Sequence, residues 1–207
     1  MLILVIVLGT IFYIALYLNK SNSKKSRKEI NNEFWEKERK ANLTRPKDLS
    51  DITYIKIPVE DLPFVQYPED KELEEIQEAI LSLAESPIAN FTGISNTDLK
   101  LKYGPANIKD IMSYDDNFTS LSNLLYEWGH YYYNQEDFDN ARQILEYAVS
   151  CKCDVSQAYI LLAEIYLADN QYDKIEELIE IASSLNTLSK ESLINSLKEI
   201  GYSSFLQ

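Results

Sequence analysis

A sparse pattern of large and small residues in residues 125–148, LYEWGHYYYNQEDFDNARQILEYA, recurs 34 residues later in residues 159–182, YILLAEIYLADNQYDKIEELIEIA. Each stretch fits a helix, a short polar turn and a second helix. Small residues at 129 and 163 would let two helix backbones approach closely, while bulky residues fill the space around them. The paired positions are Leu125, Trp128, Gly129, Tyr132, Ala141, Leu145 and Ala148, answered by Tyr159, Leu162, Ala163, Tyr166, Ile175, Ile179 and Ala182.

The repeated pattern resembles the tetratricopeptide repeat, a family of helix-turn-helix modules that bind other proteins. The family's usual order is Trp, Leu, Gly and Tyr, whereas Leu125 and Tyr159 stand here at the Trp position and Trp128 at the Leu position. Ile175 replaces the expected small Ala. Both turns are polar, and each contains an Asp that could cap the following helix. An unrelated bundle of helical hairpins is the alternative that this pattern leaves open.

Helical periodicity predicts an all-α fold over most of the chain. The repeat places helices near 117–134, 138–150, 155–169 and 171–185, the first capped by Asp115 or Asp116, and Ser189 would cap a final helix. Upstream, the pattern predicts helices over 29–42, 70–85 and 97–103. Residues 44–68 are rich in Pro and predict an extended connector, with one short strand over 52–57 lying across the helices. Two repeats are too few for stability, so the flanking helices must complete the core.

The first eighteen residues carry no charge and consist mostly of Leu, Ile and Val. A helix of that length spans roughly 27 Å, close to the hydrocarbon thickness of a bilayer. Five Lys or Arg follow between Lys20 and Lys28 and none precede, which places the C-terminal side in the cytoplasm by the positive-inside rule. A removed signal sequence is the minor alternative. The basic segment would also be attracted to anionic headgroups, by about 1 kcal/mol per basic residue.

These features divide the chain into five parts. They are a transmembrane anchor (1–18), a basic juxtamembrane linker with a polar helix (19–42), an extended connector with non-repeat helices that pack on the array (43–116), two repeats (117–187), and a capping helix with a tail (188–207). Residues 31–207 carry 15 basic and 32 acidic side chains, so the part after the anchor is strongly acidic. This argues against nucleic acid as a partner, because binding phosphates needs clustered Lys and Arg.

In tetratricopeptide arrays the partner lies on the concave face made by the first helix of each repeat, and the resemblance implies the same here. Packing of the repeat positions turns Tyr126, His130 and Tyr133 to the other side of the helix, where they form one stripe of aromatic rings with polar tips. The alternative is that a flanking helix covers this stripe and makes it core. The full set of predicted partner-binding residues is Asn123, Tyr126, Glu127, His130, Tyr133, Gln157, Ile160 and Glu164.

The sequence favours neither catalysis nor a cofactor or metal. His130 is the only histidine, and no nucleophile or titrating partner beside it is implied. Cys151 and Cys153 provide two thiols, short of the four ligands of a structural zinc, so we expect them to be reduced and structural.

We therefore expect a single-pass protein of the cell membrane whose cytoplasmic domain holds an unidentified protein or peptide partner without chemistry of its own. The alternative is a structural subunit of a larger membrane complex, with no peptide groove.

Overall fold

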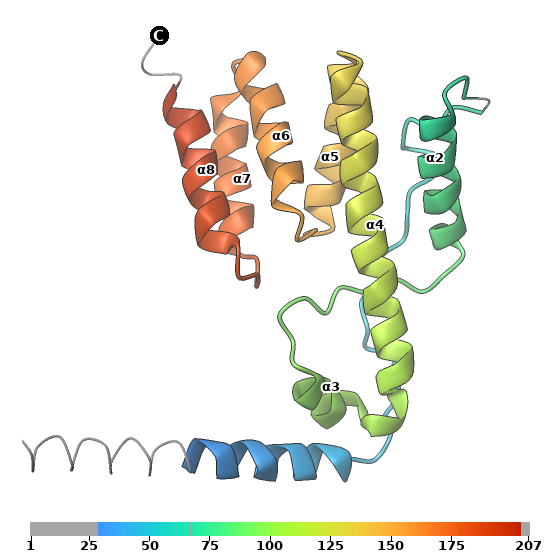
Figure 1. Ribbon diagram of the computed structural model, residues 1–207, viewed down its shortest axis with the longest axis vertical. Coiled ribbons are helices and arrows are strands. Elements are labelled where there is room, and N and C mark those ends of the chain that lie inside the picture. The colour runs from blue at the N-terminus through green and yellow to red at the C-terminus, as the bar shows by residue number, and fades with distance from the viewer. Residues whose placement is uncertain (1–28, 67, 204–207) are drawn as a thin grey trace, which may run out of the picture. The chain divides into compact units, whose positions relative to one another are not determined.

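The computed structural model describes residues 29–66 and 68–203 of the chain. All regular elements in these ranges are helical (Figure 1), which confirms the all-α prediction for the described residues. Among the described residues, 29–48 and Ser95–Ile108 form the first compact unit, and residues 49–94 and 109–203 form the second. No helix within the described residues is long and apolar enough to cross a membrane. The predicted anchor, residues 1–18, lies outside the described residues.

The first unit contains a helix over residues 29–42, α3 (Asn96–Tyr103) and the short 3-10 helix η1 (Pro105–Asn107). Ser95 begins α3 by accepting a hydrogen bond from the Asp98 backbone N–H with its side chain. The Glu38 carboxylate of the first helix accepts from the Thr97 hydroxyl at 2.6 Å and from the Lys100 ammonium group. The Lys100 hydrogen bond is the main reason why the pKa of Glu38 lies below its usual range. These polar contacts fasten the first helix to α3.

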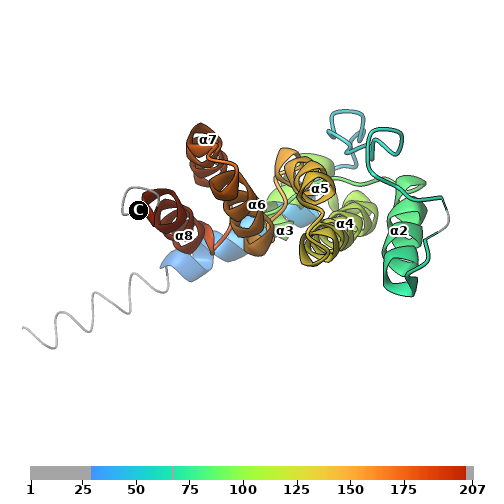
Figure 2. The same cartoon turned by 90° about the horizontal axis from the view of Figure 1, so that it is seen from above.

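The second unit is a row of helices (Figures 1 and 2). In chain order they are α2 (Lys71–Ala84), α4 (Ile108–Asn134), α5 (Phe138–Ser150), α6 (Ser156–Ala168), α7 (Tyr172–Ser183) and α8 (Lys190–Ser203). In Figure 2 they follow one another from α2 through α4 and α5 to α6, α7 and α8. One apolar core runs through all of them, and α2 supplies Leu73, Ile76 and Ile80 to it. Flanking helices thus complete the core that two hairpins alone could not close.

The repeat is visible in the hydrogen bonds of the turns as well as in the side chains. In the first hairpin the Asp137 N–H donates to the Tyr132 carbonyl at 3.0 Å, and in the second the Gln171 N–H donates to the Tyr166 carbonyl at 2.8 Å. Glu136 and Asn170 both have a φ of 60°. Each of these features recurs after 34 residues, so the α4–α5 and α6–α7 turns share one backbone conformation.

The fourteen repeat positions named above pack as the pattern predicts. All of them are buried except Ile179, which is partly buried. The same spacing continues into α8, where Leu193 and Leu197 lie 34 residues after Tyr159 and Ala163 and are buried. The final helix therefore packs against α6 and α7 in the position that the first helix of a third repeat would take.

Three details of the sequence-based predictions were wrong. The helix expected from residue 117 begins at Ile108, because Ile111 extends its buried face upstream and Asp115 accepts a hydrogen bond from the Phe91 N–H at 3.0 Å instead of capping a helix. Asp137 caps α5, but α7 begins after Gln171, whose side chain makes no capping bond.

The third error concerns residues 52–57, which form no strand. One backbone bond, from the Ile55 N–H to the Ile88 carbonyl at 2.9 Å, takes the place of a ladder. The alternating pattern instead reflects packing on one side, since Ile55 and Ile57 are partly buried against the core and Lys56 between them is exposed. The Tyr147 hydroxyl of α5 donates to the Lys56 carbonyl at 3.1 Å. The connector thus lies across the helices without joining a sheet.

Gly129 allows the close approach of α4 and α5. A Cβ atom at this position would lie 2.7 Å from both Cγ and Cδ2 of Leu145. We expect Gly129→Ala to lower the free energy of unfolding by up to about 2 kcal/mol, because overpacking costs about 1–3 kcal/mol and the gain in helix propensity returns only about 1 kcal/mol. Urea unfolding followed by circular dichroism measures this change.

The control for this prediction is the same substitution in a Leu145→Ala background, where the clashing atoms are absent. There Gly129→Ala should be neutral or stabilising, as helix propensity alone requires. An equal loss of stability in both backgrounds would show that contact with Leu145 is not what demands glycine.

Candidate partner-binding face

On α4, three of the five predicted binding residues are exposed, while Tyr126 and Tyr133 are partly buried against the core. Because Leu125, Trp128, Gly129 and Tyr132 are buried on one side, the opposite side of the helix is left open. His130 is exposed there, and Tyr126 and Tyr133 are partly exposed. Asn123 and Glu127 on the same helix are also exposed. Within the second unit His130 is therefore accessible, whereas Tyr126 and Tyr133 expose only part of their surface.

The α6 helix contributes the second half of this face. Gln157 and Glu164 are exposed and Ile160 is partly buried. The Tyr133 hydroxyl of α4 donates to the Glu164 carboxylate at 3.1 Å and so joins the two helices across the face. Burial of the ring and the neighbouring carboxylate raise the pKa of Tyr133, which keeps its hydroxyl a donor at neutral pH. We use "α4–α6 face" for the eight predicted residues on these two helices.

The aromatic rings of the α4–α6 face are held in place by neighbours. Tyr126 stacks on His130 with ring centroids 5.7 Å apart and an interplanar angle of 27°. The Asn134 side chain lies 3.3 Å from Nδ1 of His130, and Tyr133 meets Phe138 edge to face at 5.4 Å. Rings held in this way lose little side-chain entropy when a partner packs on them, which suits recognition of a peptide or helix.

The surroundings of His130 offer little for acid-base catalysis. Its contacts in the described residues are an amide and a phenol ring, whereas a general base needs a charge partner or a reacting group within hydrogen-bond reach. Among the residues that the structure describes, no three His, Cys, Asp or Glu side chains are arranged to hold a metal ion. The polar groups of this face are donors and acceptors suited to binding.

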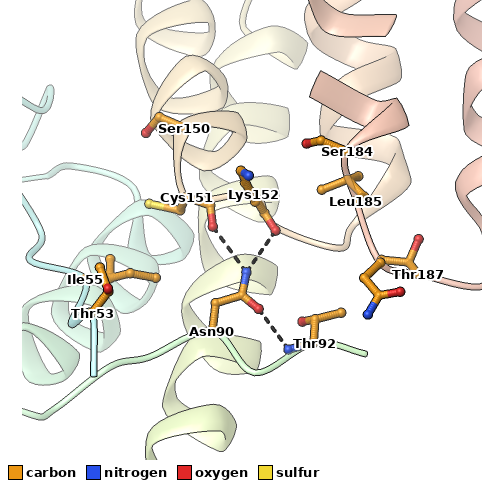
Figure 3. Close-up of a pocket in the computed structure, with 11 residues that line it drawn as sticks. Thr53, Ile55, Asn90, Thr92, Ser150, Cys151, Lys152, Ser184, Leu185 and Thr187 are labelled. Carbon is orange, nitrogen blue, oxygen red and sulfur yellow. Dashed lines mark hydrogen bonds between the residues drawn. The ribbon is translucent and has the colours of Figure 1, made fainter. Parts of the chain in front are cut away.

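A cleft lies at the ends of α5 and α7, where the sequence pattern predicts no site (Figure 3). It is a cleft of about 380 Å³ between the turns that follow these helices and the extended residues around Ile55 and Asn90. The Asn90 side chain donates to the Lys152 carbonyl at 3.2 Å and the Cys151 carbonyl at 3.4 Å, and its own carbonyl accepts from the Thr92 N–H at 2.9 Å. Asn90 thereby ties the connecting segment to the α5–α6 turn.

The chemistry of the cleft points to a structural role. Cys151 lines it, but burial raises the pKa of this thiol, so it is protonated at neutral pH and is a poor nucleophile. Cys153 is fully buried, and its carbonyl accepts from the Tyr159 hydroxyl at 3.1 Å. Both cysteines are free thiols.

The buried Cys153 thiol predicts a loss of stability at high pH. Burial raises its pKa to about 12, whereas an unfolded cysteine titrates near pH 8.5. Because the folded-state pKa is the higher one, the stabilisation is complete below about pH 8.5 and is lost as the pH rises toward 12. We expect the melting temperature to fall above about pH 9, and Cys153→Ala to reduce this fall between about pH 9 and 10, before tyrosines ionise.

Thermal melts of the chain and of Cys153→Ala, recorded across this pH range, test the assignment. The variant starts from a lower melting temperature because a buried side chain is truncated, so the slopes and not the absolute values are compared. Parallel slopes would show that the Cys153 thiol titrates no differently in the folded and unfolded states.

The sequence pattern predicts the residues of the α4–α6 face, but it does not predict the hydrogen bond between Tyr133 and Glu164 that joins the two helices. Tyr133 and Glu164 are 31 residues apart, three fewer than the repeat, as expected for a contact between neighbouring helices of successive hairpins. No protein-family model, no curated protein and no solved structure matches the chain significantly.

Proposed function

We propose that this chain is a membrane-tethered scaffold of the tetratricopeptide type, which holds a protein or peptide partner on its α4–α6 face without catalysis. The observation that carries the proposal is the aromatic stripe on α4, in which His130 is exposed and Tyr126 and Tyr133 are partly exposed, joined to α6 by the Tyr133–Glu164 hydrogen bond. The 34-residue repetition of the turn hydrogen bonds supports the choice of repeat type. The uncharged residues 1–18 and the basic segment after them support the anchor and a cytoplasmic domain.

Photocrosslinking in cells tests the binding face. A photoreactive residue at position 126 on α4 or 160 on α6 should yield the same adduct, because both side chains line one surface. A photoreactive residue at Glu176, which is exposed on α7, a helix that contributes no residue to this face, is the matched control. Adducts of equal yield from all three positions would instead favour a structural subunit that is enclosed by a larger membrane complex. No adduct from either face position would contradict the proposal.

The cytoplasmic location of the domain has a separate test. Cys151 and Cys153 are the only cysteines, so a membrane-impermeant thiol reagent applied to intact cells should leave the chain unlabelled. Because burial raises both thiol pKa values, the positive control is labelling after lysis in denaturant, when the thiols are accessible. A Glu176→Cys variant supplies an exposed thiol for the same comparison without denaturant. Labelling of that thiol from outside intact cells would reverse the proposed topology.

A further inference from the structure

The helix over residues 29–42 carries an apolar patch without a described neighbour to cover it. Ile30 is 62% exposed, Phe34 51% and Trp35 55%, although these are among the most hydrophobic side chains in the chain. The Phe34 and Trp35 rings meet edge to face at 5.3 Å, so the patch is one continuous surface. Contiguous exposed apolar groups of this kind mark a site of contact with something outside the fold.

The patch lies on the same side of the helix as the residues that pack on α3. Ile30, Phe34 and Glu38 are spaced four residues apart and therefore lie on one side of the helix, together with Ala41. At the C-terminal half this side packs on α3, where Glu38 binds Thr97 and Ala41 is fully buried. In Figure 1 the N-terminal half of this blue helix extends beyond α3. The first unit thus covers half of the face and leaves the other half exposed.

The charges around this helix indicate what kind of surface its apolar patch would contact. At about 100° per residue, Glu29 and Glu36 lie on the side of the helix opposite to Phe34, whereas Glu33 lies on the flank, about 100° from Phe34. All three acidic side chains are exposed. The sequence that leads into the helix is basic, with five Lys or Arg between residues 20 and 28 and no acidic residue. An apolar side next to a basic segment, with the Glu29 and Glu36 carboxylates turned away from it, suits an anionic lipid surface.

We propose that Ile30, Phe34 and Trp35 insert into the headgroup region of an anionic bilayer, so that the first unit lies against the membrane. This inference rests on the proposed anchor, because residues 19–28 are the only link between the apolar run and this helix and hold it within reach of the surface. Trp is enriched at the interface between headgroups and acyl chains, and Trp and Phe are typical of the apolar side of helices that lie in it. The contact would fix the first unit to the membrane surface.

The test uses the fluorescence of Trp35 in the full chain, reconstituted into phosphatidylcholine vesicles that contain phosphatidylserine. The chain has two tryptophans, so subtracting the emission of a Trp35→Phe variant isolates the signal of Trp35. Lipids brominated near the headgroup end of the acyl chain should reduce this signal by about twofold or more, since an interfacial helix buries its apolar side about 5–10 Å deep. Aqueous acrylamide should quench it less than in the urea-unfolded chain.

Matched variants separate the patch from general hydrophobicity. Ile30→Ser combined with Phe34→Ser should abolish most of the quenching by brominated lipid. Leu188→Ser combined with Met112→Ser, at exposed apolar positions in the second unit, should leave it unchanged. Circular dichroism of each variant confirms that the helices are retained.

Three outcomes would overturn the inference in distinguishable ways. Quenching that is equally strong in vesicles without phosphatidylserine contradicts the preference for anionic lipid. If acrylamide quenches Trp35 and brominated lipid does not, while the chain resists alkaline extraction, the membrane contact is contradicted but the anchor is not. The patch is then assigned to a protein partner. Release of the whole chain by alkaline extraction contradicts the anchor itself and with it this inference.

Discussion

Replacing Trp128 by alanine is expected to lower the free energy of unfolding of the second unit by about 3–5 kcal/mol, the range observed when a large aromatic side chain is removed from a packed core. Trp128 is fully buried on α4. Its ring packs against the ring of Phe64 in the connector, with centroids 4.6 Å apart, and against the ring of Tyr132, with centroids 6.4 Å apart. Truncation therefore removes contacts to a neighbouring turn of α4 and to the segment that crosses it.

Urea unfolding followed by far-ultraviolet circular dichroism measures the loss. Small domains are stable by only about 5–15 kcal/mol, so the variant should unfold at a clearly lower urea concentration. Trp35→Ala is the control, since this side chain is half exposed and should change stability by no more than about 0.5 kcal/mol. Similar losses for both tryptophans would mean that Trp128 is not part of a close-packed core.

The second large effect is expected for Gly104→Ala in the first unit. Gly104 has φ 87° and ψ 149°, a region that residues with a Cβ atom avoid. A Cβ atom there would also lie 2.8 Å from the Arg45 carbonyl oxygen and 2.8 Å from the Pro46 Cα atom. These are backbone atoms and cannot rotate away. We expect Gly104→Ala to destabilise the packing of residues 44–47 on α3 by about 2–4 kcal/mol of free energy.

Hydrogen exchange reports this change locally. The Lys47 N–H donates to the Tyr103 carbonyl at 3.0 Å, and its exchange should accelerate by about a hundredfold for a local loss of roughly 3 kcal/mol. The control is Gly201→Ala in α8, where the new Cβ would meet Ile175 Cγ2 at an ordinary 3.5 Å. That change should stabilise α8 by up to about 1 kcal/mol. Unchanged exchange at Lys47 would show that the close approach at Gly104 is not required.

The 34-residue pattern was enough to predict the hairpins because packing and turn geometry repeat together. A side chain at a given phase of the first hairpin meets the same neighbours as its counterpart in the second, so burial of Trp128 and Leu162 follows from one rule. The α5 helix from Phe138 to Ser150 has the predicted bounds for this reason. Local signals also sufficed for α2 and α3, whose caps Asp70 and Ser95 precede amphipathic or short polar runs.

The errors arose where distant segments decide the local structure. Asp115 follows the usual pattern of a helix cap, yet its carboxylate serves the Phe91 N–H, and burial raises its pKa. Asn90 gives no sequence signal for its bonds to the α5–α6 turn, because its partners are backbone carbonyls that any residue would supply. The connector could not be predicted as a strand or a coil from periodicity alone, since pairing and one-sided packing both alternate.

The α4–α6 face was predictable in its parts but not in its accessibility. The stripe of Tyr126, His130 and Tyr133 follows from helical spacing, while the position of the final helix does not. The final helix α8 packs against α6 and α7, and in the second unit His130 is exposed while Tyr126 and Tyr133 are partly exposed. The hydrogen bond between Tyr133 and Glu164 cannot be predicted from the sequence either, because it depends on how close α4 and α6 lie in space.

The affinity of the crosslinked partner for variants of the full chain tests the central claim that one face on α4 and α6 does the binding. Tyr126→Ala on α4 and Ile160→Ser on α6 should each weaken binding by about tenfold or more, equivalent to about 1.4 kcal/mol, as for anchor residues at an interface. Glu176→Ala on α7 should leave the dissociation constant unchanged. Equal affinities for all three variants, or a loss with Glu176→Ala alone, would contradict the α4–α6 face as the binding surface.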